Sequence, residues 1–153
     1  MGLVDGVHHI TFLTGDIDRL VTFCEQVFDA GKTFDMTEEG VRHVFLELGS
    51  TTVLHPFQVL DGVPLPPAPG TMFQRGRLDH FAIRTSSEEA FGEIRRRLES
   101  KAALDGEIRD MRTMWILGFQ DPDGFYGEVI WRKPELPDSE TLERARWTTV
   151  DLS

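Results

Sequence analysis

The sequence contains a single cysteine, Cys24, so no disulfide can form within the chain. No apolar run approaches the roughly 20 residues that a helix needs to cross a bilayer. The first residues lack the basic and apolar regions of a signal peptide. They also fail the N-myristoylation pattern, because Gly6 stands where Ser or Thr is required. These absences predict a soluble protein of the reducing cytoplasm that does not associate with membranes.

Positive charge is scarce as well. The 16 Lys and Arg residues are outnumbered by 26 Asp and Glu residues, which gives a formal net charge of −10 at pH 7. This charge opposes binding to phosphate backbones and to anionic membranes, so we expect no nucleic-acid partner. A chain of 153 residues, 40% of them hydrophobic and 27% charged, is typical of one folded domain that buries its own core.

The sequence contains an internal repeat, and each copy includes one histidine at the same position. The segments 7–14 and 78–85 each place a histidine, His9 or His80, at the start of a short apolar strand that leads into an acidic helix start. We interpret the chain as two copies of one module, residues 5–60 and 77–132. A proline-rich linker, residues 61–76, joins them. The tail, residues 133–153, contains a short helical candidate at Ser139–Arg146.

Each copy contains one amphipathic helix. The first helix is predicted to begin after Asp16 as its N-cap and to stop at Gly31. Its apolar residues have the spacing of one buried helix face: Ile17, Leu20, Val21, Cys24, Val27 and Phe28. Cys24 on this stripe is better explained as a core residue than as a reactive thiol. In the second helix Ser86 and Glu89 form a capping box, and the inward residues are Ala90, Phe91, Ile94 and Leu98.

Short strands complete each copy, so that each is a strand, a helix and three further strands. The strands with the clearest signals are Val41–Leu48, Thr51–Phe57, Met114–Phe119 and, more weakly, Glu107–Arg112. The predicted fold class is therefore α+β, built from two βαβββ modules.

Strand alternation predicts which face carries the histidines, because successive side chains point to opposite faces. Ile10 and Phe12 suit the helix-covered face, so His9 lies on the other face, and the same holds for His80. Glu128 lies in an apolar strand, where a carboxylate needs a cation or a strong donor. Taken singly, each histidine fits a core or edge position and the glutamate fits a solvent-facing one. Together they favour a metal site.

The sequence resembles the vicinal oxygen chelate superfamily, which includes glyoxalase I, extradiol dioxygenases and bleomycin-resistance proteins. The resemblance covers about residues 7–132. It rests on the segments His-His-Ile-Thr-Phe, Asp-Ile-Asp-Arg-Leu-Val-Thr-Phe, Asp-His-Phe-Ala-Ile and Asp-Pro-Asp-Gly before Gly-Glu-Val-Ile. It implies two βαβββ modules whose sheets curl around a central metal site, with His9, His80 and Glu128 as ligands. Fe²⁺ or Mn²⁺ suits this set best, and Zn²⁺, Ni²⁺ or Co²⁺ can also be used.

Some members of the superfamily have a fourth protein ligand in the last strand of the first module. Here the position falls on Thr52, Leu54 or His55, depending on how the preceding turn is aligned, and Glu47 is a weaker substitute. The lack of a clear Glu or Gln favours a three-ligand site. We therefore expect an extradiol-dioxygenase-like enzyme that acts on a small substrate with vicinal oxygens. His55 and Tyr126, the only tyrosine, are candidate catalytic residues.

Two other functions stay open. A lyase, an isomerase or a thiol transferase would use the same metal site and a fourth ligand. A metal-free resistance protein would instead bind an antibiotic, and the acidic net charge suits a cationic ligand. The metal triad argues against this last function. By resemblance, we expect a homodimer.

Overall fold

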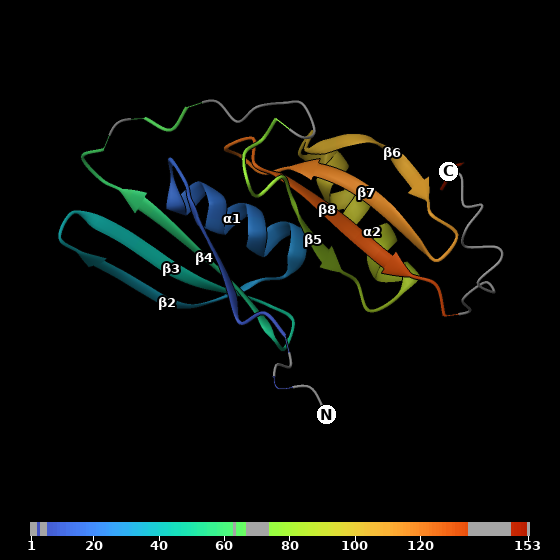
Figure 1. Cartoon of the computed structure of the whole chain (residues 1–153), viewed down its shortest axis with the longest axis horizontal. Coiled ribbons are helices and arrows are strands. Elements are labelled where there is room, and N and C mark those ends of the chain that lie inside the picture. The colour runs from blue at the N-terminus through green and yellow to red at the C-terminus, as the bar shows by residue number, and fades with distance from the viewer. Residues whose placement is uncertain (1–2, 4–5, 63, 67–73, 135–147, 153) are drawn as a thin grey trace. The chain divides into compact units, whose positions relative to one another are not determined.

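The computed structural model of the chain describes residues 3, 6–62, 64–66, 74–134 and 148–152. It divides into two compact units, residues 1–67 and 68–153, and the boundary falls inside the predicted linker (Figure 1). Each unit contains one βαβββ module, so the chain has the α+β fold that the sequence predicts.

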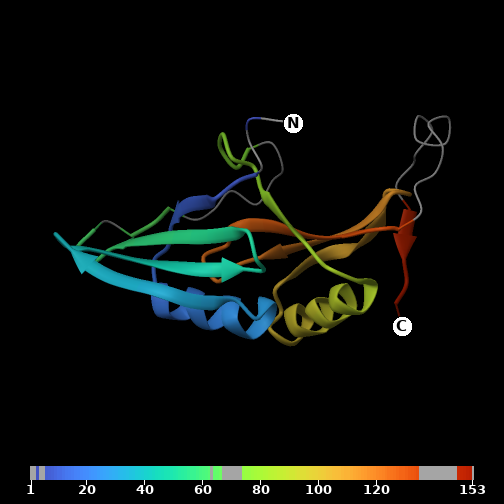
Figure 2. The same cartoon turned by 90° about the horizontal axis from the view of Figure 1, so that it is seen from below.

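Unit 1 is a helix packed on a four-stranded sheet of order β1-β4-β3-β2. The first and last strands of the module pair in parallel, and the other neighbours are antiparallel. Figure 2 shows α1 along one face of this sheet. The elements are β1 (His9–Leu13), α1 (Ile17–Phe28), β2 (Gly31–Glu38), β3 (Val41–Leu48) and β4 (Thr52–Val59).

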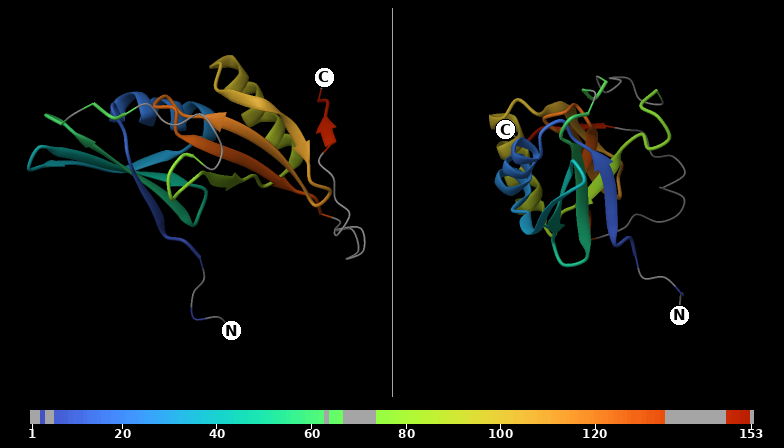
Figure 3. Two further views of the ribbon diagram at one scale, coloured as in Figure 1. Left: turned by 45° about the horizontal axis from the view of Figure 1, so that its top comes forward. Right: turned by 90° about the vertical axis from the view of Figure 1, so that its left-hand side faces the viewer.

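Unit 2 repeats this topology and adds one strand at an edge, in the order β5-β8-β7-β6-β9. Figure 3 shows α2 against one face of the sheet. The pairing of β9 with β6 covers an edge that would otherwise be open. The elements are β5 (Phe81–Arg84), α2 (Glu88–Ser100), β6 (Leu104–Asp110), β7 (Met114–Gln120), β8 (Tyr126–Arg132) and β9 (Thr148–Val150).

Each helix packs its apolar stripe against its own sheet, as the spacing predicts, although Phe28, Ala90 and Ile94 of the predicted stripes are only half-buried. The buried residues of unit 1 include Ile17, Leu20, Cys24, Val27, Val44, Leu46 and Leu54, and those of unit 2 include Phe91, Leu98, Ile108, Leu117, Phe119 and Val129. Cys24 is thus a core residue. In β1 and β5 the apolar residues of the helix-covered face are less exposed than their neighbours, in strict alternation. This leaves the opposite face of each sheet to the candidate site residues.

Two predicted helix boundaries are wrong. The first helix ends at Phe28. Its C-cap is Asp29, which adopts the left-handed conformation (φ 54°) and donates its backbone N–H to the Glu25 carbonyl, whereas Gly31 begins β2. Aspartate tolerates this conformation better than most residues. The N-cap of α2 is Ser87 rather than Ser86, and its hydroxyl accepts from the Ala90 backbone N–H. Ser86 and Ser87 are both suitable N-cap residues, so the sequence alone does not decide which of them caps the helix.

The strand limits shift for a different reason. The weak strand predicted at 107–112 is β6, which begins at Leu104 and is interrupted by a register shift between Asp105 and Arg109. Gly106, with φ 87°, lies within the shift. Such a bulge breaks the alternation on which strand prediction relies. The strand predicted at 51–57 runs from Thr52 to Val59. The helical candidate at 139–146 lies outside the described residues.

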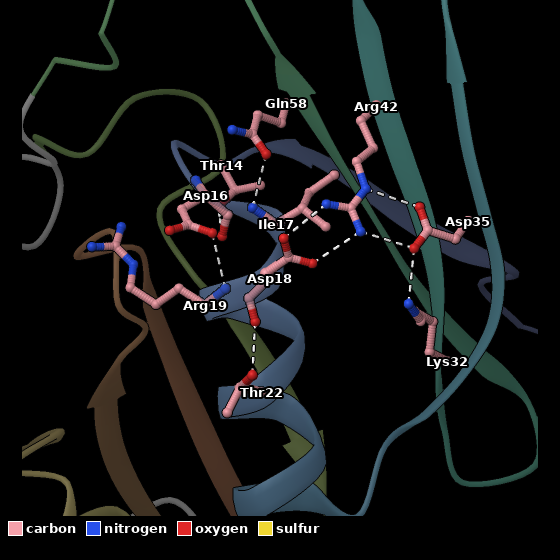
Figure 4. Close-up of polar contacts among 10 residues, drawn as sticks. All are labelled: Thr14, Asp16, Ile17, Asp18, Arg19, Thr22, Lys32, Asp35, Arg42 and Gln58. Atoms are coloured by element: carbon pink, nitrogen blue, oxygen red, sulfur yellow. Dashed lines mark hydrogen bonds and ion pairs between the residues drawn. The ribbon is translucent and has the colours of Figure 1, made fainter.

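A charged network fastens α1 to the sheet of unit 1 (Figure 4). Arg42 of β3 donates two hydrogen bonds to Asp18 in the first turn of α1, at 2.9 and 3.0 Å. It donates two more to Asp35 of β2, at 2.9 and 3.0 Å, and Lys32 adds one at 2.8 Å. The hydrogen bonds from Arg42 and then from Lys32 hold the pKa of Asp35 well below its ordinary value.

Asp35→Asn is expected to destabilise the protein by roughly 1 kcal/mol at pH 7, within the range of partly exposed ion pairs. Because the folded-state pKa of Asp35 is depressed, its contribution is present above the unfolded pKa of about 4 and is lost as the pH falls below it. Urea unfolding at pH 7 and pH 3 measures this difference. Glu38→Gln, at the exposed end of β2, is the control. An equal deficit of Asp35→Asn at both pH values would contradict the ion-pair explanation.

Candidate metal centre

The two sheets offer equivalent positions to the candidate ligands. His9 begins β1, two residues before Thr11, and Thr11 pairs with His55 of β4. His80 lies two residues before Ala82 of β5, and Ala82 pairs with Glu128 of β8. His55 is therefore the counterpart in unit 1 of Glu128 in unit 2. Each unit has one histidine near its first strand and one potential ligand on the parallel last strand.

In unit 2 the structure brings His80 and Glu128 together. The His80 Nε2 atom lies 3.5 Å from the Glu128 Oε2 atom, and only 7% of Glu128 is exposed. This distance is longer than a good hydrogen bond. Two ligand atoms that each lie about 2.1 Å from one metal ion are about 3.0–3.5 Å apart at tetrahedral or octahedral angles. The pair therefore fits two ligands of a common cation.

Charged side chains surround this pair. The Oδ2 atom of Asp79 lies 2.9 Å from His80 Nδ1 and 3.4 Å from Nη1 of Arg75. On the other side, the Nη2 atom of Arg109 lies 3.6 Å from Glu128 Oε1. Arg109 supplies part of the compensation that the buried carboxylate needs. A cation bound by His80 and Glu128 would supply more.

Tyr126 lies on the same face of β8 as Glu128, two residues earlier, and is 4% exposed. The guanidinium of Arg75 covers its ring at 3.8 Å, and Arg109 Nη2 lies 3.5 Å from its hydroxyl. Burial, followed by the negative charge of Asp105, raises the pKa of Tyr126. The phenol therefore stays protonated at neutral pH and can donate a hydrogen bond.

A cavity of about 380 Å³ opens beside Tyr126. Its walls come from β6, β8, β9 and the segment before β5, and most of them are polar or charged. The lining residues are Arg75, Asp105, Gly106, Glu107, Arg109, Tyr126 and Thr149.

Unit 1 presents a group of imidazoles on the face that α1 leaves uncovered. His55 Nε2 lies 2.9 Å from His43 Nδ1, and the rings of His9 and His55 meet edge to face at 5.6 Å. Burial, followed by the nearby His43 and His9, lowers the pKa of His55. This imidazole is therefore neutral at pH 7 and can accept a proton or ligate a cation.

Among the alternatives for the fourth position, the register favours His55. Leu54 points to the opposite face of β4 and is 2% exposed in the core, and Thr52 shares that face by alternation. Glu47 shares the face of His9 and His55, because both Glu47 and His9 pair with Val53, but it is exposed on β3, one strand further from β1. His55 alone of the three residues on β4 shares the face of His9.

Over the described residues, no three potential ligands are assembled into a metal site within either unit. Unit 2 brings together His80 and Glu128, with Tyr126 beside them, and unit 1 brings together His9 and His55. Arg75, Asp79 and Arg109 are neighbours of the site that the sequence pattern does not predict. The internal repeat could have identified Asp79, because Asp79 precedes His80 as His8 precedes His9.

A search against protein-family models matches residues 6–129 to the Glyoxalase/Bleomycin resistance protein/Dioxygenase superfamily. A search of curated protein sequences finds no match. In the described parts of the chain, no helix is long and apolar enough to span a membrane.

Solved structures share the fold. A glyoxylase/bleomycin resistance protein/dioxygenase domain from Frankia sp. EAN1pec has a TM-score of 0.71 at 18% identity, covering 85% of this chain and 99% of that one. The fosfomycin resistance protein FosX from Listeria monocytogenes, complexed with Mn(II) and sulfate, gives 0.61 at 18% identity, covering 86% and 96%. Lactoylglutathione lyase from Agrobacterium tumefaciens gives 0.61 at 17% identity, covering 85% and 96%.

Proposed function

Because the chain belongs to the glyoxalase/bleomycin resistance protein/dioxygenase superfamily, we propose that it is a divalent-metal-dependent enzyme acting on a small substrate with two adjacent oxygens. His80 and Glu128 would hold the metal together with His9. The observation that carries the proposal is the 3.5 Å separation of His80 Nε2 from the buried Glu128 Oε2. A buried carboxylate and an imidazole at this spacing suit a shared cation better than a hydrogen bond.

The donor set narrows the choice of metal. Two imidazoles and one carboxylate with open positions suit Fe²⁺ or Mn²⁺, and Zn²⁺, Ni²⁺ and Co²⁺ accept the same ligands. FosX from Listeria monocytogenes, which has the same fold, has been crystallised with Mn(II). Mn²⁺ is therefore the first ion to test.

The bound metal would act as a Lewis acid toward the adjacent oxygens of the substrate. Tyr126, kept protonated by burial, would donate a hydrogen bond to a substrate oxygen. The Nη2 atom of Arg109 contacts both the Tyr126 hydroxyl and the Glu128 carboxylate. His55, with its lowered pKa, would serve either as the fourth ligand or as the proton acceptor.

The position of His55 favours redox-neutral chemistry. The lack of a fourth ligand would favour an extradiol-type dioxygenase, whereas His55 occupies the position on β4 that corresponds to Glu128 on β8. We therefore favour a lyase, isomerase or thiol-transfer reaction. Extradiol dioxygenation is the second candidate, in which His55 would be an acid–base residue. A metal-free antibiotic binder would have no use for the pair of His80 and Glu128. For the working state we propose a cytoplasmic homodimer.

Metal binding and oxygen consumption together test this proposal. We expect the metal-free protein to gain thermal stability with Mn²⁺ or Fe²⁺, and to gain less as His55→Ala, because one of four ligands is lost. Thr52→Ala, on the opposite face of β4, is the control and should behave as the wild type. Oxygen uptake by the Fe²⁺-loaded protein with catechol-like substrates would establish dioxygenation instead. A wild type that gains no stability from any of the five ions would refute the proposed function.

A further inference from the structure

The hydrogen bond between Asp79 and His80 decides which ring nitrogen of His80 carries a proton. An ionised carboxylate can only accept, so His80 Nδ1, at 2.9 Å from Asp79 Oδ2, must be the donor. Nε2 is then unprotonated in the neutral ring. This is the nitrogen that lies 3.5 Å from Glu128 Oε2. The ring is therefore held with its lone pair on the side where a cation would bind.

Asp79 is itself held in place. Arg75 Nη1 lies 3.4 Å from the same Oδ2 atom, and the side chain of Arg75 is only 9% exposed. The guanidinium of Arg75 also packs on the ring of Tyr126 at 3.8 Å. Arg75, Asp79 and His80 thus form a chain of polar contacts that begins on Tyr126 of β8 and ends at the His80 ring, whose Nε2 atom faces Glu128.

The duplicated module repeats the arrangement with another residue. His8 precedes His9 as Asp79 precedes His80, and the Nδ1 atoms of His8 and His9 are 2.9 Å apart. In both modules the residue before the candidate ligand therefore contacts the Nδ1 atom of that histidine. The two partners differ in charge, since only Asp79 is a carboxylate.

We propose that Asp79 is a positioning residue that fixes the Nδ1–H tautomer of His80 and makes it a stronger metal ligand than His9. The proposal rests on the proposed function insofar as it concerns metal affinity. A ligating histidine whose second nitrogen donates to a carboxylate is oriented and more basic. Loss of such a partner typically lowers metal affinity by about 10–100-fold.

Two substitutions of Asp79 separate orientation from charge. Asp79→Asn retains an acceptor oxygen for Nδ1–H, so it should keep the tautomer and lower the Mn²⁺ affinity only several-fold. Asp79→Ala removes the acceptor, so the ring should change to the Nε2–H form and the affinity should fall about 10–100-fold. Glu99→Gln, exposed on α2, removes one negative charge elsewhere in unit 2 and should change neither property.

Long-range ¹H–¹⁵N NMR of the metal-free protein at pH 8 measures the tautomer, and Mn²⁺ titration against a competing chelator measures the affinity. A wild-type His80 that carries its proton on Nε2, or an Asp79→Ala variant with unchanged tautomer and affinity, would overturn the inference. If the wild type shows the Nδ1–H form and Asp79→Ala loses it, while no divalent ion binds either protein, the positioning role stands and the proposed function fails.

Discussion

Glu128→Gln is expected to lower the affinity of the protein for Mn²⁺ by at least about 100-fold while leaving the metal-free protein folded. The amide has the same shape as the carboxylate but lacks its charge, and hard divalent cations prefer anionic oxygen ligands. Glu128 is buried and faces His80 at 3.5 Å, so water does not easily replace it as a ligand. Chelator competition measures the affinity, and urea unfolding of the metal-free variant measures the stability.

In contrast to its effect on metal affinity, Glu128→Gln is expected to change the stability of the metal-free protein very little. Arg109 lies 3.6 Å from Glu128 and remains about one-quarter exposed, so water can solvate it when the carboxylate is lost. The free energy of unfolding of metal-free Glu128→Gln should thus change by less than about 1 kcal/mol. Glu99→Gln again controls for net charge. A variant that binds Mn²⁺ as tightly as the wild type would remove Glu128 from the set of ligands and leave the buried carboxylate as the partner of Arg109 alone.

Local patterns were sufficient to predict much of the fold. The helix stripes and the alternation in β1 and β5 depend on neighbours within a few residues, and the predicted sides of these elements agree with the burial. The likeness of the segments around His9 and His80 also predicted the duplication, because equivalent strands carry equivalent patterns. These features needed no knowledge of which strands pair.

The choice among Thr52, Leu54 and His55 did need that knowledge. A shift of one residue in the register of β4 exchanges its two faces, and the register depends on pairing with β1, which lies far away in the sequence. Once Thr11 pairs with His55, only His55 shares the face of His9. Without the pairing, the absence of a Glu or Gln at this position favoured extradiol chemistry.

The position of Arg109 beside the site could not be predicted from the sequence, and the reason is again the strand register. The bulge in β6 around Gly106 changes which side chains face the site, and the sequence pattern across 104–110 is neither alternating nor apolar. Arg109 thus appears in the sequence as one of many surface cations. Its role as a neighbour of Tyr126 and Glu128 follows only from the register beyond the bulge.

Gly118→Ala is expected to destabilise the protein by about 1–3 kcal/mol, because Tyr126 lies across the glycine on the face of the site. A Cβ atom at this position would overlap the Tyr126 hydroxyl and lie 2.8 Å from the Asp105 carbonyl oxygen. The phenol would have to leave its position between Arg75 and Arg109. Urea unfolding measures the loss of stability. Gly31→Ala, where no atom lies within 4 Å of the added carbon, is the matched control and should cost less than about 0.5 kcal/mol.

A double-mutant cycle with Tyr126→Phe identifies the cause of that loss. Removing the hydroxyl relieves the nearest overlap but leaves the Asp105 carbonyl contact, so the double variant should recover only part of the stability that Gly118→Ala loses. The expected coupling is about 1 kcal/mol, within the range for residues in contact. Strict additivity would mean that Tyr126 does not lie over Gly118. The phenol would then have to be removed from the group of side chains proposed to contact the substrate.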